Sequence, residues 1–162
     1  MKLEGSCHCR SVKFSLQSQY PYPFNICYCS ICRKTAGSGG YAINLSGDAA
    51  TLEVQGRENL SVYQATRTDT KTGIEASSTL ERNFCRVCGS HLWCWDARWP
   101  DFIHPHAGAI DTALPEPPEH THLMVGSRAP WVPVTLSEKD QQFEEYPTES
   151  IADWHARLNL TR

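Results

Sequence analysis

The 162-residue sequence has no long hydrophobic run and no cluster of positive charge. No apolar stretch reaches the roughly 18–20 residues that a membrane-spanning helix needs, so no membrane association is expected. Residues 1–6 lack the apolar run of a signal peptide, which favours a cytoplasmic protein. The longest run of Lys and Arg is Arg33-Lys34 and the formal net charge is −3. A nucleic-acid partner is therefore not expected, because such partners require a basic surface.

The chain also lacks internal repeats, low-complexity tracts and linker-like segments, so we expect one domain over residues 1–162. Its 40% hydrophobic content is that of an ordinary globular protein. Short apolar alternations between glycines and prolines indicate a mainly β fold of small antiparallel sheets. The predicted strands cover 12–16, 41–45, 60–63, 91–95 and 121–125.

One segment near the C-terminus has helical spacing. Ile151, Trp154 and Leu158 recur on one helix face, and Thr148 is the residue expected to cap the first turn. A short C-terminal helix that docks on a sheet is therefore predicted.

Eight cysteines are present, and most of them fall in three clusters. In a reducing compartment, clustered cysteines bind metal more often than they form disulfides. The Cys85-x-x-Cys88-Gly89 sequence has the form of a zinc knuckle, which supplies two ligands. Cys7 and Cys9 are the natural complement, because a structural zinc site takes four ligands. We expect these four thiolates to form a closed zinc site that contributes to folding.

The middle cluster offers three thiolates within six residues, from Cys27, Cys29 and Cys32. Three protein ligands and one open position are typical of a catalytic zinc ion. Three thiolates make zinc a weak Lewis acid toward water but suit it to a soft fourth ligand. We therefore expect two zinc ions per chain and a small-molecule thiol, or thiol adduct, as the partner; nothing indicates an oligomeric state.

Two further groups leave alternatives open. Cys94, on the predicted strand 91–95, is either a core thiol or the fourth ligand of the second zinc site, which would make that site structural. The pairs His104/His106 and His120/His122 each have i, i+2 spacing, which places both rings on one strand face. Such pairs are either structural or take part in metal binding or acid–base chemistry.

Taken together, three motifs and a C-terminal pattern resemble the glutathione-dependent formaldehyde-activating enzyme family, which includes centromere protein V. The motifs are Gly5-Ser6-Cys7-His8-Cys9, the stretch from Cys27 through Arg33-Lys34 to Gly37, and Phe84-Cys85-x-x-Cys88-Gly89-Ser90. The C-terminal pattern is Ala107-Gly108-x-Ile110-Asp111, His122-Leu123 and Ala129-Pro130-Trp131-Val132. The chain departs from the family where Gly often follows the first motif, here Arg10, and where His often lies in the second, here Tyr28.

The resemblance implies a tent-like β fold with two zinc ions. It assigns Cys7, Cys9, Cys85 and Cys88 to the structural ion and Cys27, Cys29 and Cys32 to the catalytic ion. The implied activity is that of a carbon–sulfur lyase or synthase acting on glutathione or its adduct with a formaldehyde-type electrophile. The alternative is a non-catalytic zinc scaffold that binds a protein partner.

Residues beside the middle cluster suit glutathione as a co-substrate. Glutathione carries two carboxylates, for which Arg33 and Lys34 are candidate anchors, and Ser38 could add a hydrogen bond. The alternative for Arg33 and Lys34 is a solvated surface pair.

Overall fold

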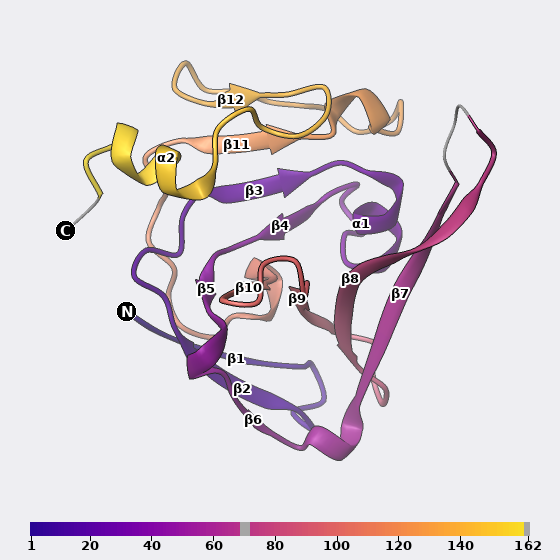
Figure 1. Cartoon of the computed structure of the whole chain (residues 1–162). Helices are drawn as coiled ribbons and strands as arrows, with labels where there is room; N and C mark the ends of the chain where they lie inside the picture. The colour runs from indigo at the N-terminus through magenta and orange to yellow at the C-terminus, as the bar shows by residue number, and fades with distance from the viewer. Residues whose placement is uncertain (69–71, 161–162) are drawn as a thin grey trace. The chain divides into compact units, whose positions relative to one another are not determined.

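The computed structural model describes residues 1–68 and 72–160 (Figure 1). The chain forms two compact units, each built from two separate stretches of sequence. Unit 1 comprises Met1–Gln19 and Gly47–Ala113, and unit 2 comprises Tyr20–Ser46 and the chain from Leu114 onward. A single domain over residues 1–162 stays a prediction.

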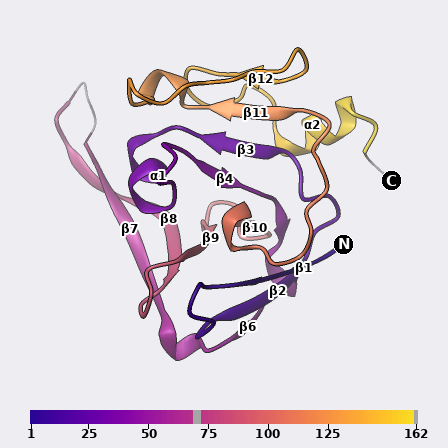
Figure 2. The same ribbon diagram turned by 180° about the vertical axis from the view of Figure 1, so that it is seen from behind.

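Unit 1 contains two antiparallel sheets. The three-stranded sheet has the order β1 (Lys2–Ser6), β2 (Lys13–Gln17) and β6 (Glu53–Gln55). The five-stranded sheet has the order β5 (Gly47–Asp48), β10 (Phe102–Pro105), β9 (His91–Trp95), β8 (Glu75–Cys85) and β7 (Leu60–Thr68). Three 3₁₀ turns complete the unit: η1 (Ala49–Thr51), η2 (Arg57–Asn59) and η3 (Ala107–Ala109). Figure 2 shows β1, β2 and β6 side by side from behind.

The core of unit 1 follows from strand alternation. Leu3 of β1 pairs with Leu16 of β2, and both side chains are buried together with Phe14. The ring of Phe14 meets that of Trp93 edge-on, with centroids 5.0 Å apart. These side chains pack together as an apolar layer. Their positions agree with the period-2 pattern of a strand, which places alternate side chains on the same face.

Unit 2 contains a four-stranded sheet and both α-helices. The sheet has the order β12 (Gln141–Gln142), β11 (His120–Leu123), β3 (Phe24–Cys27) and β4 (Ala42–Asn44). The remaining elements are α1 (Ser30–Thr35), η4 (Val125–Ser127) and α2 (Ile151–Arg157). In both views α1 lies beside β3 and β4 (Figures 1 and 2).

The mainly β fold with small antiparallel sheets and a short C-terminal helix is confirmed, with one difference in strand direction. β3 and β4 are antiparallel, but β11 runs parallel to both β3 and β12. Two parallel strands must be joined by a long crossover connection. Between β3 and β11 this connection includes residues Gly47–Ala113, which belong to unit 1.

The predicted helix is confirmed as α2, but its cap is Ser150, so the assignment to Thr148 is wrong. Ser150 accepts a hydrogen bond from the Asp153 N–H, and the Asp153 carboxylate accepts one from the Ser150 N–H. This reciprocal capping box fixes the first turn, and Trp154 packs inward with 2% of its surface exposed. No helix in the described part of the chain is long and apolar enough to span a membrane.

Candidate metal centres

The first cluster of thiols lies in unit 1, where two hairpin turns meet. The sulfurs of Cys7, Cys9, Cys85 and Cys88 all lie within 4.8 Å of one another. The Cys7 and Cys9 sulfurs are 3.5 Å apart, and the Cys9 and Cys85 sulfurs are 3.8 Å apart. Four soft donors at this separation fit a tetrahedral zinc ion, and the same four residues are the expected structural set.

Each turn is held in a left-handed backbone conformation. Gly89 follows the Cys85–Cys88 pair with φ of +75°, and its N–H donates to the Cys85 carbonyl at 2.8 Å. Arg10 follows the Cys7–Cys9 pair with φ of 61°, and its N–H donates to the Cys7 carbonyl at 2.9 Å. Glycine adopts this conformation without strain, whereas arginine does not. The departure from the family pattern at Arg10 therefore falls on a position that favours glycine.

Three thiols of this cluster, those of Cys7, Cys9 and Cys88, differ in acidity. Burial raises the pKa of Cys7 to about 11, whereas the Ser90 hydroxyl lowers the pKa of the exposed Cys88 to about 5. Hydrogen bonds from Ser11 likewise lower the pKa of Cys9. The exposed thiols thus ionise more readily than the buried Cys7, and the thiolate is the form that binds metal.

The second cluster lies in unit 2, where β3 runs into α1. The sulfurs of Cys27, Cys29 and Cys32 lie within 4.8 Å of one another. The Cys29 sulfur caps α1 by accepting a hydrogen bond from the Cys32 N–H at 3.3 Å. Cys27 and Cys32 are buried with Ala42 and Leu123, and Cys29 is half-buried at the edge of this apolar group. The end of β3, the turn that follows it and the start of α1 together place the three sulfurs close to one another.

Hydrogen bonding concentrates negative charge on one thiol of this cluster. Donation from the Cys27 and Cys32 thiols lowers the pKa of Cys29 to about 2, and the same sharing raises the pKa of Cys27. Three sulfurs that lose their protons to become thiolates are a donor set that fits a soft metal ion such as zinc. Within the described residues the group has three ligands, in contrast to the four of unit 1.

The three candidate glutathione contacts differ in their surroundings. Arg33 and Lys34 lie in the last turn of α1, directly after Cys32. Arg33 is half-buried, and its Nε is buried without a hydrogen-bond partner among the described residues. Lys34 and Ser38 are exposed. Of the three, Arg33 is the one with a buried donor that lacks a partner in the described structure.

Cys94 and the first histidine pair belong to unit 1. Cys94 is buried on β9, and its sulfur lies 3.7 Å from Nε2 of His106. His104 lies opposite Cys94 on β10, and His106 follows the end of that strand. Cys94 thus packs against a histidine of its own unit.

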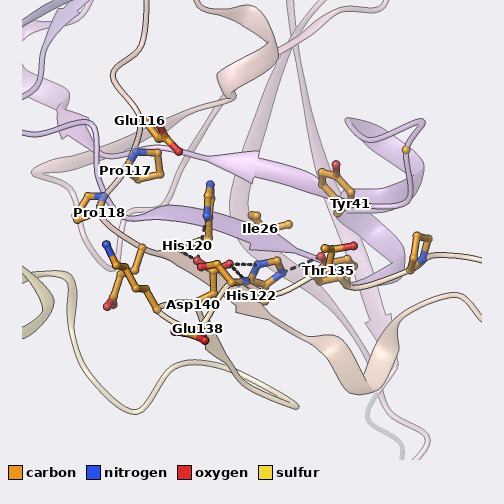
Figure 3. A pocket seen from close by; sticks show the side chains of 16 residues that line it. Ile26, Tyr41, Glu116, Pro117, Pro118, His120, His122, Thr135, Glu138 and Asp140 are labelled. Atoms are coloured by element: carbon orange, nitrogen blue, oxygen red, sulfur yellow. Dashed lines mark hydrogen bonds and ion pairs between the residues drawn. The ribbon is translucent and has the colours of Figure 1, made fainter.

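The second histidine pair lines a cavity of about 1080 Å³ in unit 2 (Figure 3). His120 and His122 project into it from β11, and Asp140 lies between them. Nδ1 of His120 is 3.1 Å from the Asp140 carboxylate, and Nε2 of His122 is 3.9 Å from it. The Tyr28 hydroxyl lies 2.9 Å from Nδ1 of His122.

Sequence reasoning missed Asp140, which lies 18 residues beyond His122 in a loop without a recognisable motif. Burial raises the pKa of Asp140, but hydrogen bonds from the His120 and Ser137 N–H groups outweigh it and lower that pKa below its ordinary value. Burial lowers the pKa of His122. A neutral His122 with its hydrogen on Nε2, toward the carboxylate, accepts the Tyr28 hydroxyl at Nδ1.

The fold and the two thiol clusters define a small β protein whose sulfur donors fit two zinc ions. The family model described as glutathione-dependent formaldehyde-activating enzyme matches residues 2–126. A curated Halomonas elongata protein named for this family is 58% identical over 160 residues, covering 99% of this chain and 98% of its own. A crystal structure of a Rhodobacter sphaeroides protein has 27% identity and a TM-score of 0.52, over 71% of this chain and 92% of that one.

The chain therefore belongs to the glutathione-dependent formaldehyde-activating enzyme family, and the resemblance drawn from its motifs is confirmed. Membership supports chemistry that involves glutathione and formaldehyde.

Proposed function

We propose that this protein is a zinc-dependent carbon–sulfur lyase or synthase that acts on glutathione or on its adduct with a small formaldehyde-type electrophile. The observation that carries the proposal is the three-sulfur group of Cys27, Cys29 and Cys32. Zinc prefers four ligands, so three protein sulfurs leave one position for a soft ligand from the substrate. Cys7, Cys9, Cys85 and Cys88 are proposed to hold a second, structural zinc ion.

When bound, zinc would supply a soft Lewis acid that favours the thiolate over the thiol of an incoming sulfur compound. The residues of the chain position the substrate around it. Arg33 has a buried Nε without a partner among the described residues, which suits it to donate a hydrogen bond to a glutathione carboxylate. Lys34 and Ser38, being exposed, are proposed to add outer contacts to the same tripeptide.

The reaction needs no oxidant, reductant or further co-reactant. In the synthetic direction the glutathione sulfur attacks the carbonyl carbon of the aldehyde, and the proton lost from sulfur ends on the carbonyl oxygen. In the lyase direction the carbon–sulfur bond breaks, the hydroxyl loses its proton, and the sulfur regains one. An aligned thiolate is the nucleophile that this step requires.

We propose the cytoplasm as the place of this reaction and residues 1–162 as one catalytic domain. No disulfide links cysteines in the part of the chain that the structure describes, which suits a reducing compartment. The curated relative is matched over 99% of this chain, so both units belong to the shared sequence.

The experiment is an exchange measurement on glutathione and ¹³C-formaldehyde by NMR with zinc-loaded protein. The wild type is expected to accelerate exchange between free and sulfur-bound carbon, and Cys29→Ser is expected to lower that acceleration at least about 100-fold. Thr35→Val, which removes a hydroxyl from the same helix, serves as the matched control and should keep the activity. A folded, zinc-loaded wild type without acceleration would support the non-catalytic scaffold instead.

A further inference from the structure

Unit 1 buries an arginine that forms no ion pair within the described part of the chain. Arg82 lies on β8 with 4% of its surface exposed, and its Nη1 lacks a hydrogen-bond partner among the described residues. None of the ion pairs found between described side chains includes it. Burying an unpaired guanidinium is costly, so the site is incomplete as it stands.

Two other buried charged groups each form an ion pair. The buried carboxylate of Asp96 is paired with Arg98 at 2.6 Å, and the buried Glu119 is paired with Arg157. The contrast marks Arg82 as a buried charge without an ion-pair partner among the described residues.

Other polar side chains occupy neighbouring positions of the five-stranded sheet. The strand register places Cys94 of β9 directly opposite Arg82, and His104 of β10 directly opposite Cys94. Side chains at paired positions share one face of a sheet. The His106 ring contacts the Cys94 sulfur and lies 5.8 Å, centroid to centroid, from the His91 ring. Nδ1 of His91 and Nδ1 of His106 are both buried without a partner in the described structure.

The two rings are neutral at physiological pH. Burial, together with the charge of Arg82, lowers the pKa of His91, and burial lowers the pKa of His106 to about 3. If the Cys94 thiol donates to Nε2 of His106, the ring hydrogen lies on Nδ1, which is the atom without a partner. One guanidinium nitrogen and two imidazole nitrogens in this part of unit 1 are thus buried without a partner among the described residues.

We propose that Arg82, His91 and His106 form a binding site for a small carboxylate. The two oxygens of a carboxylate match the planar guanidinium and can also accept from an imidazole N–H. A metal ion fits less well, because Arg82 repels a cation and the described ligand atoms gather within 4.8 Å of one another at the two cysteine clusters rather than here. The carboxylate can come from a free acid such as formate or from glutathione, which carries two. The site does not depend on the zinc chemistry proposed above.

The test uses the full-length, zinc-loaded protein and formate as the probe. Thermal unfolding is followed while formate replaces chloride at constant sodium concentration. At about ten times the dissociation constant the melting temperature of the wild type should rise by about 3–6 °C and then saturate. Arg82→Met should lose this response, whereas Arg67→Met, which removes an exposed arginine of β7 in the same sheet, should keep it.

A second measurement on the wild type covers the case in which Arg82→Met does not fold. Formate binding is followed through line broadening of ¹³C-formate, and S-methylglutathione is added as a competitor. Displacement of formate identifies glutathione as a source of the carboxylate, and retention identifies a free acid. Absence of saturable formate binding to the wild type, or an equal response of a folded Arg82→Met, would overturn the proposal.

Discussion

The hydroxyl of Tyr28 lies 2.9 Å from Nδ1 of His122, so the residue between Cys27 and Cys29 is tied to β11. Tyr28 packs with Ile26, Val125 and Val132, whereas Cys27 packs in a separate apolar group. Tyr28 therefore anchors the segment between Cys27 and Cys29 to one apolar group, while the sulfurs of its two neighbours belong to the other group. The Asp140 carboxylate lies 3.9 Å from Nε2 of the same His122 ring.

Replacing Tyr28 with phenylalanine should lower the free energy of unfolding by about 1–2 kcal/mol. The substitution keeps the ring but leaves Nδ1 of His122 buried without a hydrogen-bond donor. A buried acceptor that loses its donor destabilises the folded state, because in the unfolded chain water satisfies it. Urea denaturation of wild type and variant measures the difference. Tyr41→Phe, which changes a neighbouring ring 5.4 Å away, is the control and should stay within about 0.5 kcal/mol. Equal effects of the two substitutions would contradict the anchoring role.

Replacing Cys88 with serine should abolish the folded state or lower its stability by roughly 5 kcal/mol or more, because metal binding and folding are one equilibrium at a closed site. Zinc content should fall from about two ions per chain to about one. Circular dichroism melts and elemental analysis check both effects. A folded Cys88→Ser protein with one zinc ion fewer and an unchanged melting temperature would argue against a structural ion in unit 1.

Replacing Arg10 with glycine should raise the free energy of unfolding by up to about 1 kcal/mol. Arg10 has φ of 61°, a conformation that a residue with a Cβ adopts only at a cost and that glycine adopts freely. Arg10→Ala keeps the Cβ and should give no gain. If alanine stabilises as much as glycine, the arginine side chain rather than its backbone is the source of the effect.

The ion pair of Asp96 predicts a defined dependence on pH. The Arg98 guanidinium, assisted by the Thr79 hydroxyl, lowers the pKa of Asp96 to about 2 from an ordinary 3.8. The pair's stabilisation is complete above pH 4 and is lost as pH falls toward 2, because the unfolded chain takes up the proton first. Asp96→Asn should therefore cost about 1–2 kcal/mol at pH 7, discounted for the exposed Arg98, and progressively less below pH 4.

Denaturation of both proteins at several pH values gives this difference. Any loss of metal in acid affects wild type and variant alike, so the difference between them is the quantity to follow. A difference that stays constant from pH 7 to pH 3 would show that Asp96 is not held as a carboxylate by its partners.

The cysteine groupings could be predicted from sequence because two-residue and three-residue spacings restrict which sulfurs can meet. The strand 91–95 was predicted with its observed bounds, since alternation and aromatic residues coincide there. Seven of the described strands were not predicted, because short or polar sequences give weak alternation: β1, β3, β5, β6, β8, β10 and β12. The helix α1 was missed because its six residues begin inside the cysteine cluster.

Long-range placement was the part that sequence could not supply. His122 and Asp140 meet through a loop without a motif, and β11 returns parallel to β3 only after the chain has passed through unit 1. Arg82 gave no signal, because an arginine within a strand is ordinary until its burial and lack of a partner are known.

The central claim is that the sulfur of glutathione is recognised at the Cys27, Cys29 and Cys32 group. The most direct measurement is calorimetric titration of zinc-loaded protein with glutathione and with S-methylglutathione, in two buffers of different ionisation enthalpy. Glutathione should release about one proton on binding and bind at least about tenfold more tightly than its S-methyl form. Cys29→Ser should remove this preference. Equal affinity for the two compounds, without proton release, would show that the sulfur is not recognised at this group.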